Sequence, residues 1–398
     1  MISIHGIPRR TLIILLIVLA VGVAARVGLA LGSESRFHSQ DYQGLHDIKA
    51  WVDAGTMILE GRNPYIESYI LDFGPVWAWI CALPVAIAGK LGLGPFGASV
   101  LIKSILILAD IAMLVLIGSI AARLSRDPVL PCALFFLNPI SIILTGYVGQ
   151  FDIVSVVPIA VLVLFLVREP GNSPIDTRKR AFGTGLLTGI SAAVKHSSGP
   201  LFLFLPRMFG GVRKYLLSVS VALAVFLVLL VPYILDGGPG SIIEDIFGQQ
   251  GRSLGTGWHW LLGIAGVVPS AALQKSLWAL FVLLTALLVW RNRPRKLELI
   301  SLYYVTIVLF VPSFGRHYFL YPVIFGGLAY PVMTLVFSFA ASAYFLSSSM
   351  FSGPLAVTDS PIPEWPAFLV LAVWWVYIIV SITRSKTASG SVQTGATC

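Results

Sequence analysis

Long apolar runs, separated by short polar or basic segments, dominate this chain. The runs cover 11–31, 96–121, 129–148, 152–167, 181–206, 215–235, 272–290, 297–312, 319–347 and 366–383. A helix needs about 20 predominantly apolar residues to cross the hydrocarbon core of a bilayer. The pattern therefore predicts an all-α fold: a polytopic membrane helix bundle of about 10–12 transmembrane helices.

Lysine and arginine gather between these runs and predict the topology. The basic clusters lie at 9–10, 123–126, 168–180, 207–214, 291–296 and 384–386. The positive-inside rule assigns such clusters, and with them the N-terminus, to the cytoplasm. Between the first two clusters the chain leaves the cytoplasm through 11–31 and can make only one full return crossing, for which 96–121 is the better candidate. A shorter apolar run at 75–88 is therefore expected to be a re-entrant or interfacial helix. The run 181–206 must cross the membrane out and back, which requires a break near 195–200. The run 319–347 must likewise make two short passes, with a break at Tyr330-Pro331.

The composition agrees with a bilayer as the solvent. Of 398 residues, 57% are hydrophobic and 11% are charged, whereas an average soluble domain has roughly 25% charged residues. A soluble enzyme is therefore excluded. The net charge of +9 comes from short clusters and not from one basic face, which argues against nucleic acid as a partner. Three cysteines form no disulfide framework or metal-binding spacing, so we expect a single integral membrane domain over 1–398.

The first external loop, residues 32–74, is the strongest candidate for a site. It is acidic, and residues 45–59 have apolar positions at helical spacing, which predicts an amphipathic helix on the membrane surface that Gly61 ends. Loops of this length usually carry function. Asp47 stands at the start of the helix and Asp41 precedes it. Asp47 is therefore either a catalytic carboxylate or a simple helix N-cap. Asp41 is the second catalytic candidate, held in reserve to Asp47.

Short motifs in this loop and beyond it resemble the GT-C superfamily of integral membrane glycosyltransferases. The likeness is to the catalytic subunit of GPI mannosyltransferase and to related prokaryotic transferases that use polyprenyl-phosphate sugars. The motifs are DIKAWVDA at 47–54, EGRNPY at 60–65, FGPVWAW at 73–79, Lys103 with Asp110, FLNP at 136–139, GQFD at 149–152, AVKH at 193–196 and RHYFLY at 316–321. The helices of 75–325 follow the family pattern, whereas the C-terminal helices of 326–398 have no assigned role.

The resemblance implies a reaction and a set of partners. It implies transfer of a hexose (mannose-like) or a pentose from a polyprenyl-phosphate donor to an extracytoplasmic lipid or glycan acceptor, with inversion and with Asp47 as general base. The family carries an Asp-x-Asp pair, but here the first position is Leu45. Metal dependence is therefore open: no cofactor is required, although Mg²⁺ or Mn²⁺ could bind between Asp47 and Asp152. Membrane lipids are the remaining expected partners.

The chemistry also requires cations for the departing phosphate. A charged side chain at membrane depth is costly unless it faces a cavity or a partner, so each such cation is a candidate for binding the donor phosphate. The alternative is that the side chain extends to the membrane surface and places its charge in water. The donor-phosphate candidates are Lys195, His196, Arg316, His317 and, in a Gly-rich loop that could equally be a connector, Arg252.

Three other acidic or basic positions have two interpretations each. Asp152 either binds the acceptor or a metal, or is a solvated loop acid. Lys103 and Asp110 share one helix face, seven residues apart. They either belong to the site, as their place among the family motifs implies, or are a buried structural pair with other partners, which is the favoured interpretation.

Two other classes of function compete with the transferase. A polytopic lipid or sugar transporter or flippase would be expected to show inverted repeats, and none is evident in the sequence. A non-catalytic subunit of a glycosyltransferase is the third alternative. The four asparagines lack the N-glycosylation pattern, which favours a prokaryotic plasma membrane over the endoplasmic reticulum.

Overall fold

A computed structural model of the chain describes residues 8–38, 46–67, 73–167, 177–209, 211–237, 240, 242–243, 270–292, 294–311, 315–347 and 364–391, and these contain helices but no strands. The helices are α1 Arg9–Gly32, α2 Glu34–Phe37, α3 His46–Leu59, α4 Pro64–Glu67, α5 Pro75–Leu91, α6 Gly94–Arg123, α7 Val129–Phe136, α8 Pro139–Ile142, η2 Ile143–Val148, α9 Asp152–Leu166, α10 Thr177–Val194, η3 His196–Phe204, η4 Pro206–Phe209, α11 Val212–Gly237, α14 Ala271–Asn292, α15 Lys296–Phe310, η5 Arg316–Phe319, α16 Leu320–Ala329, α17 Pro331–Ser347 and α18 Trp365–Ser391.

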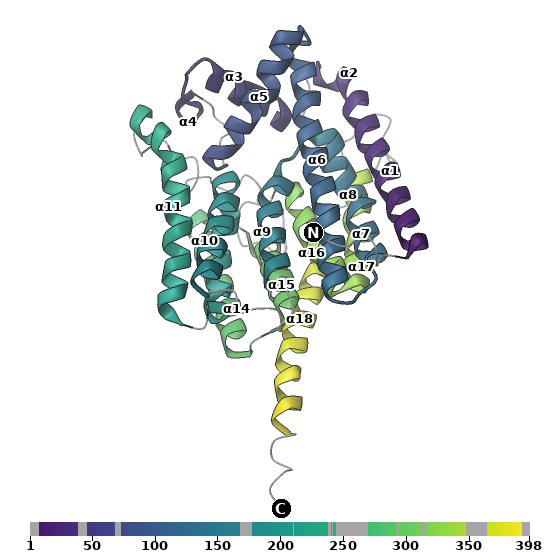
Figure 1. The fold of residues 1–398 in the computed structure, drawn as a ribbon, viewed down its shortest axis with the longest axis vertical. Helices are drawn as coiled ribbons and strands as arrows, with labels where there is room; N and C mark the ends of the chain where they lie inside the picture. Colours follow the sequence, from purple (N-terminus) through teal and green to yellow (C-terminus); the bar gives the residue numbers. More distant parts are fainter. Residues whose placement is uncertain are drawn as a thin grey trace, which may run out of the picture.

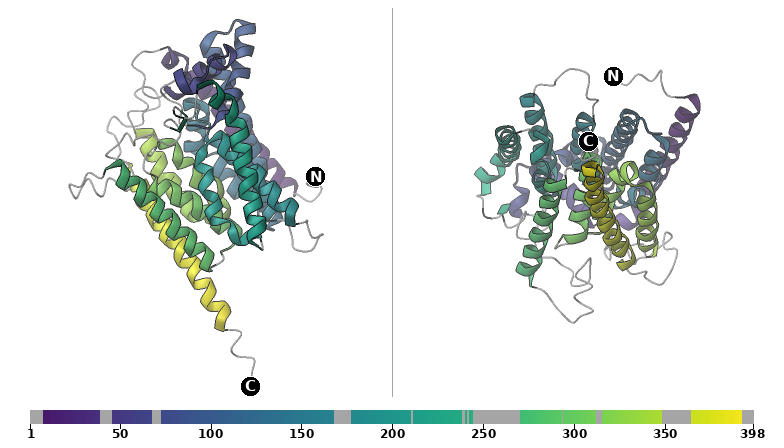
Figure 2. Two further views of the ribbon diagram at one scale, coloured as in Figure 1. Left: turned by 90° about the vertical axis from the view of Figure 1, so that its left-hand side faces the viewer. Right: turned by 90° about the horizontal axis from the view of Figure 1, so that it is seen from below.

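The long helices run side by side, while α3, α4 and α5 gather at one end of the bundle (Figure 1), which we call the α3 end. Helix α18 lies alongside α14 and extends beyond the other helices at the opposite end (Figure 2). Helix α5 is thus part of a cap on the bundle, packed against α3 and α6. This agrees with the interfacial helix expected near 75–88.

Five helices in the described part of the chain are long and apolar enough to cross a membrane: α1, α6, α11, α14 and α18. The segment from α7 to η2 adds a sixth if its 47° bend is allowed within one span. This count is lower than the ten to twelve passes expected, because breaks divide other passes into helices too short to be counted alone. Helices α9 and α17 are examples. A polytopic helical membrane protein is nevertheless confirmed.

The two expected breaks are present. Helix α10 ends at Val194, and the chain continues as the 3-10 helix η3, which contains Pro200. Helix α16 ends at Ala329, and α17 begins at Pro331. Proline has no backbone N–H and clashes with the preceding turn, so it ends a helix or begins a new one.

Residues of two basic clusters, 123–126 and 291–296, bind helix ends on the side of the bundle opposite α3. Arg123 donates a hydrogen bond of 2.6 Å to the carbonyl of Leu164, and Lys296 donates to the carbonyl of Leu166. Arg126 likewise donates to the carbonyl of Leu328. Positive side chains thus hold the last carbonyls of helices α9 and α16, where the helix dipole favours a cation. The sequence pattern had predicted that these clusters share one side.

A buried ion pair joins α1 to the middle of the bundle. Arg26 is fully buried, and its Nε lies 2.6 Å from Oδ2 of Asp110 on α6. Its Nη2 donates to Ser141 Oγ at 2.7 Å and its Nη1 to the carbonyl of Phe136 at 2.8 Å. Arg26 therefore fixes the broken segment α7–η2 against α1 and α6.

Lys103 and Asp110 are both buried and do not pair with each other. Lys103 donates from Nζ to Ser33 Oγ at 2.8 Å, whereas Asp110 pairs with Arg26. The expectation that these two residues have other partners is confirmed.

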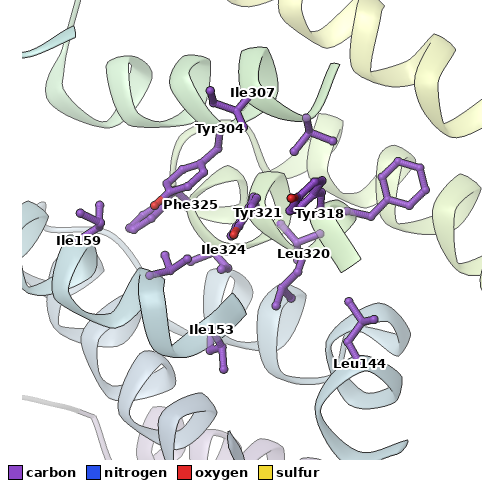
Figure 3. Packing of buried hydrophobic residues seen from close by; sticks show 14 of the residues in the cluster. Leu144, Ile153, Ile159, Tyr304, Ile307, Tyr318, Leu320, Tyr321, Ile324 and Phe325 are labelled. Atoms are coloured by element: carbon purple, nitrogen blue, oxygen red, sulfur yellow. The ribbon is translucent and has the colours of Figure 1, made fainter. Parts of the chain in front are cut away.

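Aromatic side chains fill the core between α9, α15 and α16 (Figure 3). Tyr304 on α15 stacks on Phe325 of α16 with ring centroids 5.7 Å apart. Tyr318 stacks on Tyr321 at the same separation. These rings bury large areas and prefer offset or edge contacts, which fixes the angle between neighbouring helices. They bring the start of α16 next to the start of α9.

Candidate active site

Helix α3 carries Asp47 to the centre of the α3 end. The apolar face of α3, which includes Ile48 and Trp51, is buried against the bundle, as its amphipathic pattern predicts. Asp47 is half-buried at the second position of the helix, and its Oδ2 accepts a hydrogen bond from the amide of Gln150. One turn later, Trp51 donates from its indole N–H to the carbonyl of Gly149 at 3.0 Å. Helix α3 is thus tied to the turn that precedes α9.

Gly149 makes this close approach possible. It ends η2 in the left-handed region, with φ 79° and ψ 35°. A Cβ at this position would lie 2.8 Å from Cδ1 of Ile48 on α3. Glycine tolerates both the positive φ and the contact. The turn between η2 and α9 can therefore lie directly beneath the start of α3.

We predict that Gly149→Ala lowers the stability of the protein. The left-handed conformation alone costs a residue with a Cβ about 1–2 kcal/mol, and the contact with Ile48 adds to this. Gly183→Ala is the matched control, because a Cβ at Gly183 in α10 meets no atom within 4 Å. Alanine in a helix interior is more stable than glycine by roughly 0.5–1 kcal/mol. Melting temperatures in detergent should fall for the first variant and hold or rise for the second; equal shifts would contradict this account.

Asp152 begins α9 and is fully buried. Its Oδ1 accepts hydrogen bonds from Lys195 Nζ at 2.7 Å and from the hydroxyl of Tyr321 at 2.6 Å. Its Oδ2 has no hydrogen-bond partner among the described residues. A helix N-terminus favours a carboxylate, and the ammonium compensates for burial. Asp152 is therefore not the solvated loop acid that one interpretation of the sequence allowed.

Lys195 occupies the break between α10 and η3. Its backbone is extended, with φ −148° and ψ 119°, and its side chain is buried. The ammonium lies 2.7 Å from Asp152 Oδ1 and 3.2 Å from Nε2 of His317. It also lies over the rings of Phe151 and Tyr318, at 5.1 and 4.7 Å from their centroids. The buried ammonium of Lys195 is thus surrounded by the Asp152 carboxylate, the His317 ring and the faces of two aromatic rings.

Arg316 and His317 enter from η5, the turn between α15 and α16. Both are half-buried. The Arg316 guanidinium lies 5.5 Å from the ring centroid of Tyr344 on α17, while His317 contacts Lys195. Two neighbouring residues of one short turn therefore connect the Lys195 cluster with the α3 end of α17.

The structure brings together most of the residues selected from the sequence. Asp47 is joined to Asp152 through Gln150, two residues before it in the same turn. Asp152, Lys195 and His317 form one contact network. His196 is the first residue of η3 and directly follows Lys195. The candidates Asp41 and Arg252 lie outside the described residues.

Sequence reasoning did not select Gln150, Trp51 and Tyr321 as site residues, although all three contact the site. Each stands inside one of the recognised motifs, Trp51 in 47–54, Gln150 in 149–152 and Tyr321 in 316–321. An amide or a hydroxyl has no charge that must be compensated in a membrane, so an isolated polar residue of this kind gives a weaker signal than a lysine.

The contacts of Asp152 do not fit a divalent metal. In the described part of the chain, no group of three or more His, Cys, Asp or Glu is placed to hold a metal ion. Asp152 Oδ1 already accepts two hydrogen bonds, one of them from an ammonium. A divalent cation needs several oxygen ligands and would lie next to that positive charge. The arrangement fits a carboxylate–ammonium pair better.

Comparison with known proteins adds a structural relative. No protein-family model and no curated protein matches the chain. Among solved structures, the chain is similar to ArnT from Cupriavidus metallidurans, whose structure has undecaprenyl phosphate bound. The similarity covers 94% of this chain and 78% of ArnT, with a TM-score of 0.52 and 14% sequence identity. At this identity the similarity shows a common fold, and the fold that the sequence resemblance implied is confirmed.

Proposed function

We propose that the protein is a membrane glycosyltransferase that transfers a hexose or a pentose from a polyprenyl-phosphate donor to a lipid or glycan acceptor. The single observation that carries the proposal is the convergence at the α3 end: Asp47, Asp152, Lys195 and His317 lie in one set of linked contacts. The undecaprenyl phosphate bound to ArnT supports the donor class. We further propose that the α3 end faces away from the cytoplasm, because the basic clusters gather at the opposite end.

Asp47 acts as the general base in this proposal. The acceptor hydroxyl attacks the anomeric carbon and loses its proton to the Asp47 carboxylate, while the bond from that carbon to the phosphate oxygen breaks. The hydrogen bond from Gln150 orients the carboxylate. Direct displacement with one base inverts the anomeric configuration. The half-buried position of Asp47 leaves part of the side chain accessible to an acceptor.

Arg316 and His317, supported by Lys195, receive the departing phosphate. Arg316 brings a guanidinium that can bind two phosphate oxygens at once. The charge of Lys195 is shared with Asp152, so its role is to hold His317 and to keep the local field positive when negative charge develops on the phosphate. Asp152 then acts as a positioning residue for Lys195.

The proposal is tested by a transfer assay with purified protein in lipid nanodiscs. Undecaprenyl phosphates carrying a radiolabelled hexose or pentose serve as donors, and a total lipid extract supplies acceptors. Label should move into a new lipid or glycan product, and free undecaprenyl phosphate should accumulate in proportion. If neither donor is consumed by folded wild-type protein while ArnT is active under the same conditions, the proposal is wrong.

We predict that Arg316→Gln raises the KM for the donor. A hydrogen bond to a charged group contributes about 1.5–3 kcal/mol, so the loss should be roughly ten- to a hundredfold. Lys179→Gln is the control, because Lys179 is exposed in α10 near the opposite end of the bundle. Initial rates over a range of donor concentrations give both constants. An unchanged KM in the Arg316 variant would remove this residue from the phosphate site.

A further inference from the structure

The ring of Phe151 lies between the helices of the α3 end and the Lys195 ammonium. Phe151 directly precedes α9 and is 2% exposed. The Nζ atom of Lys195 lies 5.1 Å from the centroid of its ring. Phe151 also directly follows Gln150, whose amide donates to the carboxylate of Asp47. One residue of this turn therefore contacts the proposed base, and the next residue contacts the buried cation.

Three aromatic residues of the α3 end pack around Phe151. Trp77 of α5 stacks on its ring, with centroids 4.7 Å apart and an angle of 15° between the ring planes. Trp51 of α3 and Phe73, which precedes α5, contact the ring edge-on at 5.1 and 5.6 Å. All four side chains are almost completely buried. Aromatic contacts have preferred geometries, so the orientation of Phe151 depends on how α3 and α5 pack.

The backbone holds the start of α5 against the break that carries Lys195. The N–H of Gly74 donates to the carbonyl of Val194 at 3.0 Å, and Val194 directly precedes Lys195. A Cβ at Gly74 would lie 2.1 Å from the carbonyl oxygen of Ala193, so this approach requires glycine. The segment that packs on Phe151 from one side is therefore also tied to the chain that carries the ammonium on the other side.

The Phe151 ring holds the ammonium without adding a negative charge. Lys195 already pairs with the Asp152 carboxylate at 2.7 Å, and the sum of these two charges is zero. A second carboxylate in place of the ring would make the cluster negative and would repel a phosphate. The face of an aromatic ring attracts a cation through its quadrupole but has no net charge. A ring at position 151 can therefore stabilise the buried ammonium and leave its field available to the departing phosphate.

We propose that Phe151 is a positioning residue, which holds the Lys195 ammonium through the face of its ring and thereby couples the packing of α3 and α5 to the phosphate site. This inference rests on the proposed function, because Lys195 acts there on the phosphate of the donor. Phe151 itself touches no reacting atom. The donor phosphodiester carries one negative charge, whereas the departing phosphate monoester carries nearly two at neutral pH. A weaker hold on the ammonium should therefore lower kcat more than it raises the KM for the donor.

The first test changes the charge distribution of the ring and keeps its shape. Phenylalanine analogues with one, two and three fluorine atoms are placed at position 151 by stop-codon suppression. Fluorine withdraws electrons from the ring, which weakens its attraction for a cation. In transfer from an undecaprenyl-phosphate sugar, kcat should fall stepwise with the number of fluorine atoms. With three fluorine atoms the loss should be about tenfold, equivalent to roughly 1.4 kcal/mol, while the KM for the donor changes less.

The same analogues at position 325 provide the matched control. Phe325 is equally buried and also stacks on an aromatic ring, that of Tyr304, with centroids 5.7 Å apart, but it lies in the core between α15 and α16 (Figure 3). Fluorine at position 325 should leave kcat at the wild-type value. If kcat at position 151 does not depend on the number of fluorine atoms, or depends on it equally at both positions, the ring acts only by packing and the proposal is wrong.

The second test needs no sugar transfer. Melting temperatures of the Phe151 series are measured in the wild-type background and in Lys195→Met. They should fall with each added fluorine when Lys195 is present, and should be independent of fluorine when it is absent. If Lys195→Met does not fold, Lys195→Met combined with Asp152→Leu removes both charges and takes its place. Equal trends in the two backgrounds would contradict the proposed contact. The expected difference in melting, found in protein that transfers no sugar, would instead reject the proposed function.

Discussion

Replacing Asp47 with Asn should lower the rate of sugar transfer by about 10²–10⁴-fold, the usual contribution of a general base. Asparagine keeps the shape of the side chain and an oxygen that can accept the hydrogen bond from Gln150, so the fold should persist. It cannot take the acceptor proton. The effect should therefore appear in kcat, while the KM for the donor changes little. Initial rates with a labelled polyprenyl-phosphate sugar measure both.

Asp53→Asn provides the matched control for this experiment. Asp53 belongs to the same helix, but its side chain is exposed. The same chemical change there should leave kcat at the wild-type value. Full activity of the Asp47 variant, in protein that melts at the wild-type temperature, would show that another group is the base.

The largest effect on stability is expected at Arg26. Arg26→Met removes the cation from a fully buried pair and leaves the carboxylate of Asp110 uncompensated. Breaking a buried pair in this way costs about 3–5 kcal/mol. The carbonyl of Phe136 and the hydroxyl of Ser141 also lose their donor. The free energy of unfolding, measured in mixed micelles with a denaturing detergent, should fall by this amount.

Two comparisons separate the lost charge from the lost packing. The double variant Arg26→Met, Asp110→Leu removes both charges and should recover a large part of the stability, because apolar residues can replace a buried pair at little cost. Arg62→Ala breaks an exposed pair with Glu60 and should leave the free energy of unfolding nearly unchanged. If the double variant is no more stable than the single one, hydrogen bonds to Phe136 and Ser141 dominate over the ion pair.

Local sequence patterns predict that the chain is a membrane protein, where two of its helices break and that one helix lies on the surface. Apolar runs, basic clusters and proline positions predicted a polytopic bundle with a broken helix at 195–200 and a second break at Tyr330-Pro331. The structure contains both breaks. These features follow from short-range rules: lipid requires continuous apolar helices, and proline ends them. Residues 45–59 were likewise identified as an amphipathic helix because their period is local.

The charged residues in the apolar runs indicate which side chains belong to a site, but they do not indicate which of these side chains form ion pairs with each other. The sequence marked Lys195 and Asp152 as unusual because charge is costly in a membrane. It offered no means of predicting that one neutralises the other, since 43 positions separate them. The packing of α10 against α9, where Ser191 Oγ donates to the carbonyl of Ser155, brings them together. The same is true of Asp110, whose partner Arg26 lies 84 positions away.

By itself, the sequence determined that this chain spans a membrane, where its helices break and which charged residues need an explanation. Each of these follows from the free energy of placing one side chain or one segment in lipid. The tertiary structure decided that Gln150 contacts Asp47 and that Lys195 pairs with Asp152. These depend on how helices distant in sequence pack together, and packing is a property of the whole bundle.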